Sequence, residues 1–319
     1  MAVYTEVTDA DLQGFLAGYD LAPVTAFKGI AEGVENTNYL LQTEGGGYFL
    51  TLYEKRVARA DLPFFIDCLR HLTSRGLACP QPVADRQGRI LQELCGKPAA
   101  LMTLLPGLSP KHPNVTQCGE AGSALARLHL AGADFAGSRA NSMGLDAWRK
   151  LVAATHTQAD SVQPGLAALL ASELAHAEAA WPHGLSKGLI HADLFPDNVL
   201  FSGDRVTGLI DFYFACTDLY AYDVTVCLNS WCFEPNGAYN LSKGRALLSC
   251  YQSIRPLPPG ERAALPILAR ASALRFLVTR LYDWLNRDPS ALVRPKDPLE
   301  FLRRLRFHQG ARDSSAYGI

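Results

Sequence analysis

Three oxygen-bearing side chains, Asp193, Asn198 and Asp211, have the order and spacing of a phosphoryl-transfer site. The apolar run 189–190 enters a loop that holds Asp193, and a second apolar run, 198–201, leaves it. A turn and a returning strand would then bring Asp211 back beside this loop. Phosphoryl transfer needs a carboxylate that orients and deprotonates a hydroxyl, and Asn and Asp oxygens that hold Mg²⁺. We therefore expect Asp193 to be the base and Asn198 and Asp211 to bind the metal.

A purely structural interpretation of the same residues is also available. Asp193 and Asp197 are common turn formers, Asn198 could begin a strand, and His191 could be a buried histidine with satisfied hydrogen bonds. Taken together, however, the pattern His-x-Asp-x-x-x-x-Asn followed by a strand-terminal Asp resembles the catalytic loop and metal-binding Asp of the kinase superfamily. We place His191 with the catalytic residues as the side chain that supports the loop.

Two positions separate this sequence from protein kinases. Protein kinases have Arg between the His and the Asp, and Gly two residues after the metal-binding Asp, whereas Ala192 and Tyr213 stand here. The sequence therefore resembles the small-molecule branch of the superfamily, which includes aminoglycoside and choline kinases. This resemblance implies an α+β, two-lobed protein-kinase-like fold: a small antiparallel-sheet N-terminal lobe, and a larger, mainly helical C-terminal lobe, with MgATP between them.

Composition narrows the class of protein. The chain has 319 residues, 48% of them hydrophobic, and can bury a core of two-domain size. A net charge of −1 argues against a nucleic-acid or anionic-membrane surface. The sequence has no apolar run of membrane-spanning length and no basic-then-apolar leader, so we expect a cytoplasmic protein. The eight cysteines form no Cys-x-x-Cys pair and are expected to be free thiols. Nothing in the sequence specifies an oligomeric state.

Residues 1–105 predict the sheet lobe that binds the nucleotide. Strands are expected at 24–29, 39–43, 48–53, 89–94 and 98–104, with helices at 9–16 and 62–75. A turn containing Gly29, Gly33, Asn36 and Asn38 could cover the phosphates with backbone N–H groups, although the two Asn side chains could instead cap the turn. In the superfamily the adenine docks on the hinge between the lobes, which corresponds here to Thr103–Leu104–Leu105.

A lysine that kinases use for the nucleotide phosphates is missing from the expected strand. Thr51 occupies its position, and Phe65 stands where a helix should supply the glutamate partner of that lysine. The two halves of the ion pair are thus absent together, which is consistent because a lone buried Glu would be costly. Lys28, Lys55 and Arg56 are the candidate replacements, although each could simply be a solvated charge.

Residues 106–319 predict the helical, catalytic and substrate-binding lobe. Helices are expected at 115–130, 167–180, 224–231, 265–286 and 299–307. The resemblance also implies that Asp223 braces the catalytic loop through its carboxylate.

Several longer phrases resemble one family within this branch, the bacterial homoserine kinases of the aminoglycoside-phosphotransferase-like group. The phrases are residues 35–39, 50–55, 96–100, 105–107 and 229–234. The resemblance covers about residues 4–307 and includes Thr51. It implies phosphorylation of the L-homoserine hydroxyl by ATP with Mg²⁺, a step toward threonine.

Homoserine carries a carboxylate and an ammonium on one carbon, so its pocket needs a cation and an acid or carbonyl. Arg275 and Arg280 could bind the carboxylate. Asp218, Tyr220 and Asn229 could meet the ammonium, although either arginine could instead form an ordinary ion pair. Choline, ethanolamine or methylthioribose are alternative acceptors, and a choline site would need a cage of aromatic faces. A regulatory pseudokinase is the alternative of another class, favoured only by the missing lysine.

Overall fold

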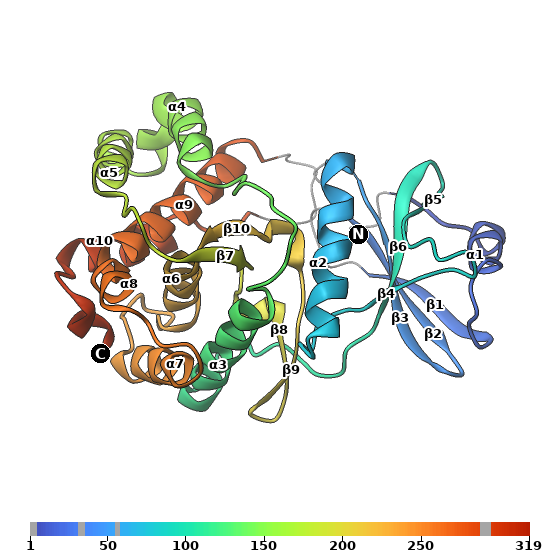
Figure 1. Cartoon of the computed structure of the whole chain (residues 1–319). Coiled ribbons are helices and arrows are strands. Elements are labelled where there is room, and N and C mark those ends of the chain that lie inside the picture. Colours follow the sequence, from blue (N-terminus) through green and yellow to red (C-terminus); the bar gives the residue numbers. More distant parts are fainter. Residues whose placement is uncertain (1–4, 31–35, 55–57, 288–294) are drawn as a thin grey trace. The chain divides into compact units, whose positions relative to one another are not determined.

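The computed structural model describes residues 5–30, 36–54, 58–287 and 295–319 (Figure 1). The chain divides into two compact units, Met1–Pro106 and Gly107–Ile319. The boundary expected from the sequence follows Leu105 and so lies next to this division. The first unit is built on an antiparallel sheet and the second is mainly helical, as the sequence predicts.

The sheet of the first unit has the strand order β1-β2-β3-β6-β4, and β5 pairs with β6. All of these pairings are antiparallel. The strands are β1 (Val24–Ile30), β2 (Thr37–Thr43), β3 (Gly46–Leu52), β4 (Pro82–Val83), β5 (Gln92–Leu94) and β6 (Lys97–Thr103). Gly46, with φ +146°, is the first residue of β3, directly after the turn from β2, and a residue with a side chain would be strained there.

Helix α1 (Asp9–Leu16) covers one face of this sheet. It begins with a capping box, in which Thr8 accepts a hydrogen bond from the Asp11 N–H and the Asp11 carboxylate accepts one from the Thr8 N–H. Leu12 and Phe15 of the helix pack on alternate, inward-facing residues of β2, β3 and β6. Helix α2 (Leu62–Ser74) lies on the other side of the sheet in Figure 1.

The second unit contains the remaining helices and two small antiparallel sheets, β7 with β10 and β8 with β9. Its strands are β7 (Lys187–Ile190), β8 (Val199–Ser202), β9 (Arg205–Leu209) and β10 (Cys216–Leu219). Its helices are α3 (Val115–Ala131), α4 (Leu145–Val162), α5 (Leu166–Ala180), α6 (Tyr220–Trp231), α7 (Leu241–Ile254), α8 (Pro259–Ala263), α9 (Leu265–Leu285) and α10 (Leu299–Gly310).

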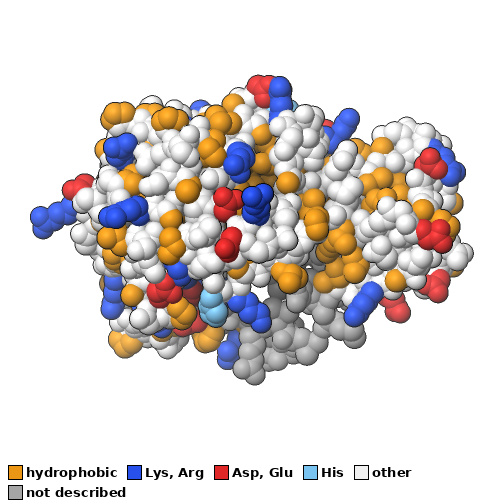
Figure 2. Space-filling view, turned by 90° about the horizontal axis from the view of Figure 1, so that it is seen from below, with side chains coloured by type: hydrophobic (Ala, Val, Ile, Leu, Met, Phe, Trp, Pro, Cys, Tyr) orange, Lys and Arg blue, Asp and Glu red, His pale blue; other side chains and the backbone are white. Residues whose placement is uncertain are grey.

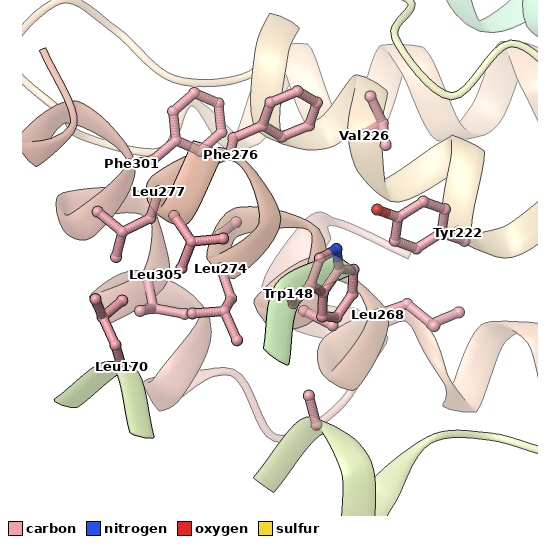
Figure 3. Close-up of a cluster of buried hydrophobic side chains, with 14 of the residues drawn as sticks. Trp148, Leu170, Tyr222, Val226, Leu268, Leu274, Phe276, Leu277, Phe301 and Leu305 are labelled. Atoms are coloured by element: carbon pink, nitrogen blue, oxygen red, sulfur yellow. The ribbon is translucent and has the colours of Figure 1, made fainter. Parts of the chain in front are cut away.

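Helix α9 is the centre of the packing in the second unit. It contacts α4, α5, α6 and α10, and its apolar residues form a continuous buried cluster with theirs. Figure 3 shows this cluster, in which Leu274 and Leu277 of α9 lie among side chains from the neighbouring helices. The helix expected at 265–286 is therefore confirmed, and the packing fixes which residues α9 presents to the rest of the unit.

Some helices of the second unit are not among the predicted elements. Helix α4 buries Trp148, Val152, Thr155 and Ala159 at helical spacing, but Thr and Ala give only a weak hydrophobic signal. Helix α7 buries Lys243 and Gly244 along with its leucines. Its buried face is therefore not a continuous apolar stripe, which is the pattern that predicts a helix. Helix α6 begins at Tyr220 rather than 224, because the aromatic run at its start also suits a strand.

The surface carries both signs of charge. On the face drawn in Figure 2, basic and acidic side chains are interspersed among apolar and uncharged ones, in keeping with the net charge of −1. Of the helices in the described part of the chain, none is both long enough and apolar enough to cross a membrane.

His308 on α10 is 1% exposed, and its burial makes the free energy of unfolding depend on pH. Its Nδ1 lies 3.0 Å from the Tyr317 hydroxyl and its Nε2 lies 3.0 Å from Asn229 Oδ1. Burial, together with the charge of Arg304, lowers the pKa of His308 to about 3. The ring therefore stays neutral in the folded protein at pH values where an unfolded chain would protonate it.

We expect the free energy of unfolding to fall as the pH drops below about 6.5, because the unfolded chain then binds a proton that native His308 does not. His308 alone should contribute about 1.4 kcal/mol per pH unit until the folded pKa is approached. The free energy of unfolding can be measured by urea unfolding at several pH values between 7 and 4. For the His308→Gln variant, its slope against pH should be shallower by that amount. The exposed His183 gives the control variant His183→Gln, which should keep the wild-type slope. Equal slopes for wild type and His308→Gln would contradict the neutral buried ring.

Candidate active site

The loop predicted to be catalytic, and called the catalytic loop below, runs from the end of β7 to the start of β8. Strand β7 pairs with β10 up to Ile190, and β8 then pairs with β9 as a hairpin. The Ile210 N–H donates to the Asn198 carbonyl over 3.0 Å, so the residue just before Asp211 is bonded to the start of the hairpin. The returning strand thus brings Asp211 back to the loop end of the hairpin, beside Asn198.

The carboxylate of Asp223 organises the loop, and it comes from the first turn of α6. Its Oδ2 accepts from the His191 N–H over 2.8 Å, and its Oδ1 accepts from the Ala192 N–H over 2.8 Å. His129 Nε2 of α3 lies 3.1 Å from Oδ2. Burial alone would raise the pKa of Asp223, but the hydrogen bond from His129 and the backbone N–H of His191 lower it. The carboxylate is therefore an ionised brace.

His191 is fully buried, and both of its ring nitrogens are bonded. Nε2 lies 3.0 Å from the Ile210 carbonyl, which can only accept, and Nδ1 accepts from the Asp193 N–H over 3.3 Å. These partners assign the proton to Nε2. Burial lowers the pKa of His191 more than the charge of Asp223 raises it, so the ring is neutral. His191 thus ties the loop to the residue before Asp211.

The rest of the loop is held by α6 and by Asn198. The Leu194 carbonyl accepts from Trp231 Nε1 over 2.8 Å. Asn198 donates through Nδ2 to the Asp193 carbonyl over 2.8 Å, and this nitrogen lies 3.5 Å from the carboxylate oxygen Oδ2 of Asp193. Because the amide nitrogen is turned toward Asp193, the amide oxygen is the atom of Asn198 that can take a cation. Asp193 keeps a side-chain exposure of 20%, enough to meet a substrate.

Asp197 points elsewhere, although it is a neighbour of Asn198 in the sequence. Its carboxylate lies 3.3 Å from the Lys296 ammonium, and both side chains are exposed. Asp211, in contrast, has φ +63°, an uncommon backbone conformation for a residue other than Gly. A conformation of that kind points to a functional constraint on the residue, here its direction at the end of the hairpin.

In the first unit, Thr51 is 4% exposed and donates its hydroxyl to Asn38 Oδ1 over 2.9 Å. Asn36 Oδ1 accepts from the Glu54 N–H over 3.3 Å. Both Asn side chains therefore hold the sheet together, which is the internal role considered as their alternative. Phe65 is buried in α2, so no carboxylate faces Thr51 from that position.

Of the basic residues considered for the phosphates, Lys28 is exposed on β1. Its cross-strand partner is Leu40, and Asn38 of the same strand pairs with Thr51, so Lys28 lies on the same sheet face as this pair. Gly33, Lys55 and Arg56 lie outside the described residues. Gly29 pairs with Tyr39 within the sheet.

The predicted hinge follows the end of β6. The Thr103 N–H donates to the Gln81 carbonyl over 2.9 Å, and the Leu104 N–H donates to the Gly47 carbonyl over 3.0 Å. These two donors are thus used within the unit. An adenine would have to use the carbonyls of this segment or the N–H of Leu105.

The structure does not bring the predicted substrate residues together. Arg280 pairs with Glu300 over 2.5 Å and covers the Phe301 ring at 4.5 Å. Asp218 accepts from Asn141 over 2.7 Å, and the Tyr220 ring is covered by the Arg255 guanidinium at 4.4 Å. These three side chains therefore have protein partners.

Asn229 needs a correction. It is 0% exposed, its Nδ2 donates to the Ala269 carbonyl over 2.9 Å, and its Oδ1 faces His308. A buried amide with both ends bonded cannot also receive a substrate ammonium. Of the five predicted substrate residues, only Arg275 reaches the catalytic loop, where it donates to the Ala192 carbonyl and lies 3.8 Å from Asp193 Oδ1.

Two residues that hold the loop, Trp231 and Arg275, were not expected to do so. Trp231 belongs to residues 229–234, one of the phrases that carry the family resemblance. The sequence therefore marked the residue, but it gave no indication that its partner is the Leu194 carbonyl. His129 has a structural role: its Nε2 lies 3.1 Å from Asp223 Oδ2 and its Nδ1 lies 2.8 Å from the Tyr251 hydroxyl.

Comparison with known proteins shows the fold and the family to which the chain belongs. The solved structure of the amicoumacin kinase, in complex with AMP-PNP and Ca²⁺, matches with a TM-score of 0.71 and 16% sequence identity, covering 97% of this chain and 93% of that one. The protein thus has the protein-kinase-like fold of small-molecule phosphotransferases. Residues 26–257 match the family described as the phosphotransferase enzyme family APH, and the chain belongs to that family.

Relatives of much higher identity extend over the whole chain. A homoserine kinase of Xanthobacter autotrophicus is 61% identical over 319 residues, covering 100% of this chain and 99% of the relative. A homoserine kinase of Afipia carboxidovorans is 58% identical, covering 100% and 98%.

The environment of Thr51 allows a test of the missing lysine. We expect Thr51→Lys to lower the free energy of unfolding by about 1–3 kcal/mol, because an ammonium would replace a buried hydroxyl with no carboxylate at Phe65 to meet it. Nucleotide affinity should not increase. Urea unfolding and calorimetric titration with ATP measure both quantities, with Thr51→Val as the control that removes only the hydroxyl. Tighter ATP binding at unchanged stability would show that an acidic partner does lie there.

Proposed function

We propose that the protein transfers the γ-phosphoryl group of ATP to the side-chain hydroxyl of L-homoserine, giving O-phospho-L-homoserine and ADP. The observation that carries this proposal is the 61% identity to a homoserine kinase over the whole chain. The loop geometry supports the reaction class, because the predicted base and both predicted metal ligands lie at one end of the β8–β9 hairpin. A cytoplasmic location stays a prediction from the sequence.

Asp193 is the proposed base. Its carboxylate accepts the proton of the homoserine hydroxyl as the oxygen attacks the γ-phosphorus, and the bond from that phosphorus to the β–γ bridging oxygen breaks to release ADP. The backbone around Asp193 is fixed on both sides, by His191 at its N–H and by Asn198 at its carbonyl. This rigidity supports a positioned base, since a misplacement of about 1 Å can cost roughly 10²-fold in rate.

Asn198 and Asp211 are the proposed ligands of Mg²⁺. An amide oxygen and a carboxylate form an oxygen donor set that suits this ion, and the turn of the Asn198 nitrogen toward Asp193 leaves the oxygen for the metal. When bound, Mg²⁺ would supply positive charge that neutralises the charge developing on the nucleotide phosphates. His191 would keep the Asp211 end of the hairpin in register with the loop.

The nucleotide is proposed to bind the first unit through backbone groups rather than through a lysine–glutamate pair. The segment containing Gly29 and Gly33 would cover the phosphates, and the carbonyls of Thr103 and Leu104 with the N–H of Leu105 would meet the adenine. Of the three basic residues considered for the phosphate charge, Lys28 is the one that the structure describes, and it is exposed on the same sheet face as Thr51.

The acceptor is tested by coupled ADP release with homoserine, choline, ethanolamine and methylthioribose. Homoserine should give the highest kcat/KM, and Asp193→Ala should lower kcat by about 10²–10⁴-fold while ATP binding is retained. A higher kcat/KM with another alcohol would replace homoserine as the substrate. ATP binding without turnover on any alcohol would instead favour a regulatory pseudokinase.

The metal assignment is tested by comparing two aspartates of the same loop region. Asp211→Asn should raise the Mg²⁺ concentration needed for half-maximal activity by about tenfold or more, since about 1.4 kcal/mol of lost binding corresponds to tenfold. Asp197→Asn should leave the Mg²⁺ titration unchanged, because Asp197 faces Lys296. Equal shifts for the two variants would contradict the hairpin geometry.

A further inference from the structure

The guanidinium of Arg275 is enclosed at the catalytic loop. The residue lies on α9 and is 2% exposed, and its guanidinium carbon stands 4.3 Å from the ring centre of Phe276 and 5.5 Å from that of Phe214. Its Nη1 donates to the Ala192 carbonyl. A cation buried against aromatic faces is costly to desolvate and is retained only where it meets specific acceptors.

The peptide that Arg275 contacts is strained. Ala192 has φ +62°, in the left-handed region, which is unfavourable for a residue with a Cβ. Its N–H donates to the Asp223 carboxylate over 2.8 Å and its carbonyl accepts from Arg275. Two buried side chains of opposite charge therefore hold the two polar groups of one residue, and they come from different helices, α6 and α9.

Asp193, the next residue, is affected by the same guanidinium. Nη2 of Arg275 lies 3.8 Å from its Oδ1, while Nδ2 of Asn198 lies 3.5 Å from its Oδ2. The two carboxylate oxygens thus face two different nitrogen groups. Both the backbone before Asp193 and the direction of its carboxylate depend on Arg275.

This arrangement argues against the sequence expectation that Arg275 binds the substrate carboxylate. A guanidinium with 2% exposure, bonded to a backbone carbonyl and close to two aromatic rings, has little surface to offer a zwitterion. We propose that Arg275 is a positioning residue: it locks the left-handed Ala192 peptide and orients the Asp193 carboxylate, and the carboxylate of the acceptor is bound by another group. The inference rests on the proposed function only in that a hydroxyl acceptor is needed to measure it.

The test separates turnover from substrate binding in Arg275→Met and Arg275→Lys. For Arg275→Met we expect kcat to fall about 10²-fold, as for a misplaced catalytic group, with KM for homoserine and ATP changed less than about threefold. Arg275→Lys keeps the charge and can reach one acceptor, so it should recover part of the lost kcat. Both variants should discriminate against 3-aminopropan-1-ol, which lacks the homoserine carboxylate, as strongly as the wild type does.

Arg270 provides the matched control on the same helix. It pairs with the buried carboxylate of Glu173 on α5 over 2.6 Å, away from the catalytic loop. Arg270→Met should lower the thermal unfolding temperature but leave kcat unchanged. An equal fall of kcat in Arg270→Met would show that general loosening of α9, and not the contact to Ala192, is responsible.

Other outcomes decide the proposal directly. A rise of KM for homoserine by tenfold or more at unchanged kcat, with loss of discrimination against 3-aminopropan-1-ol, would show that Arg275 binds the substrate carboxylate. Unchanged kcat and KM would also overturn it. If Arg275→Met does not fold, Arg275→Lys carries the test, since wild-type kcat in that variant would exclude a role for the planar guanidinium. If wild type prefers another alcohol, the proposed function fails, while the comparison of kcat on that alcohol still tests Arg275.

Discussion

The catalytic loop depends on one buried carboxylate. Asp223 is 0% exposed and accepts hydrogen bonds from two successive backbone N–H groups of the loop, while His129 meets one of its oxygens. A buried charge without such donors would cost several kcal/mol. The loop must therefore adopt a conformation in which the His191 and Ala192 N–H groups point to this carboxylate. The same constraint places Ala192 in the left-handed region, directly before Asp193.

The brace extends well beyond the loop itself. His129 continues to the Tyr251 hydroxyl, which also accepts from Arg255 over 3.1 Å, and Arg255 is paired with the buried Glu261 over 2.7 Å. Helices α3, α6, α7 and α8 are thus joined to the loop through side chains that are buried or, for Arg255, 12% exposed. Because each polar group in this series has a partner, burial adds rigidity to the loop without leaving an unsatisfied group.

The local parts of this architecture could be predicted from the sequence, and the long-range parts could not. The spacing from His191 to Asn198 and the hairpin that returns Asp211 are encoded within about twenty residues, so turn and strand patterns were enough. Asn229 and Arg280 were assigned to the substrate because they follow the metal-binding strand or flank an apolar stripe. Which face of α6 or α9 meets the loop depends on how the helices pack against one another. The sequence pattern does not determine how each helix is rotated about its own axis. Trp231 shows the same limit, since its partner Leu194 is set by the same packing.

The hydroxyl–amide pair of Thr51 and Asn38 has a consequence for control of activity. In protein kinases the corresponding lysine bonds a glutamate on a movable helix, and moving that helix makes or breaks the pair and so switches the enzyme on or off. Here the pair joins two neighbouring strands and forms when the sheet folds. Thr51 and Phe65 carry no charge, so a movement of α2 has no ion pair to make or break at this position. A phosphorylation-driven switch of the protein-kinase type therefore has no ion pair at Thr51 through which it could act.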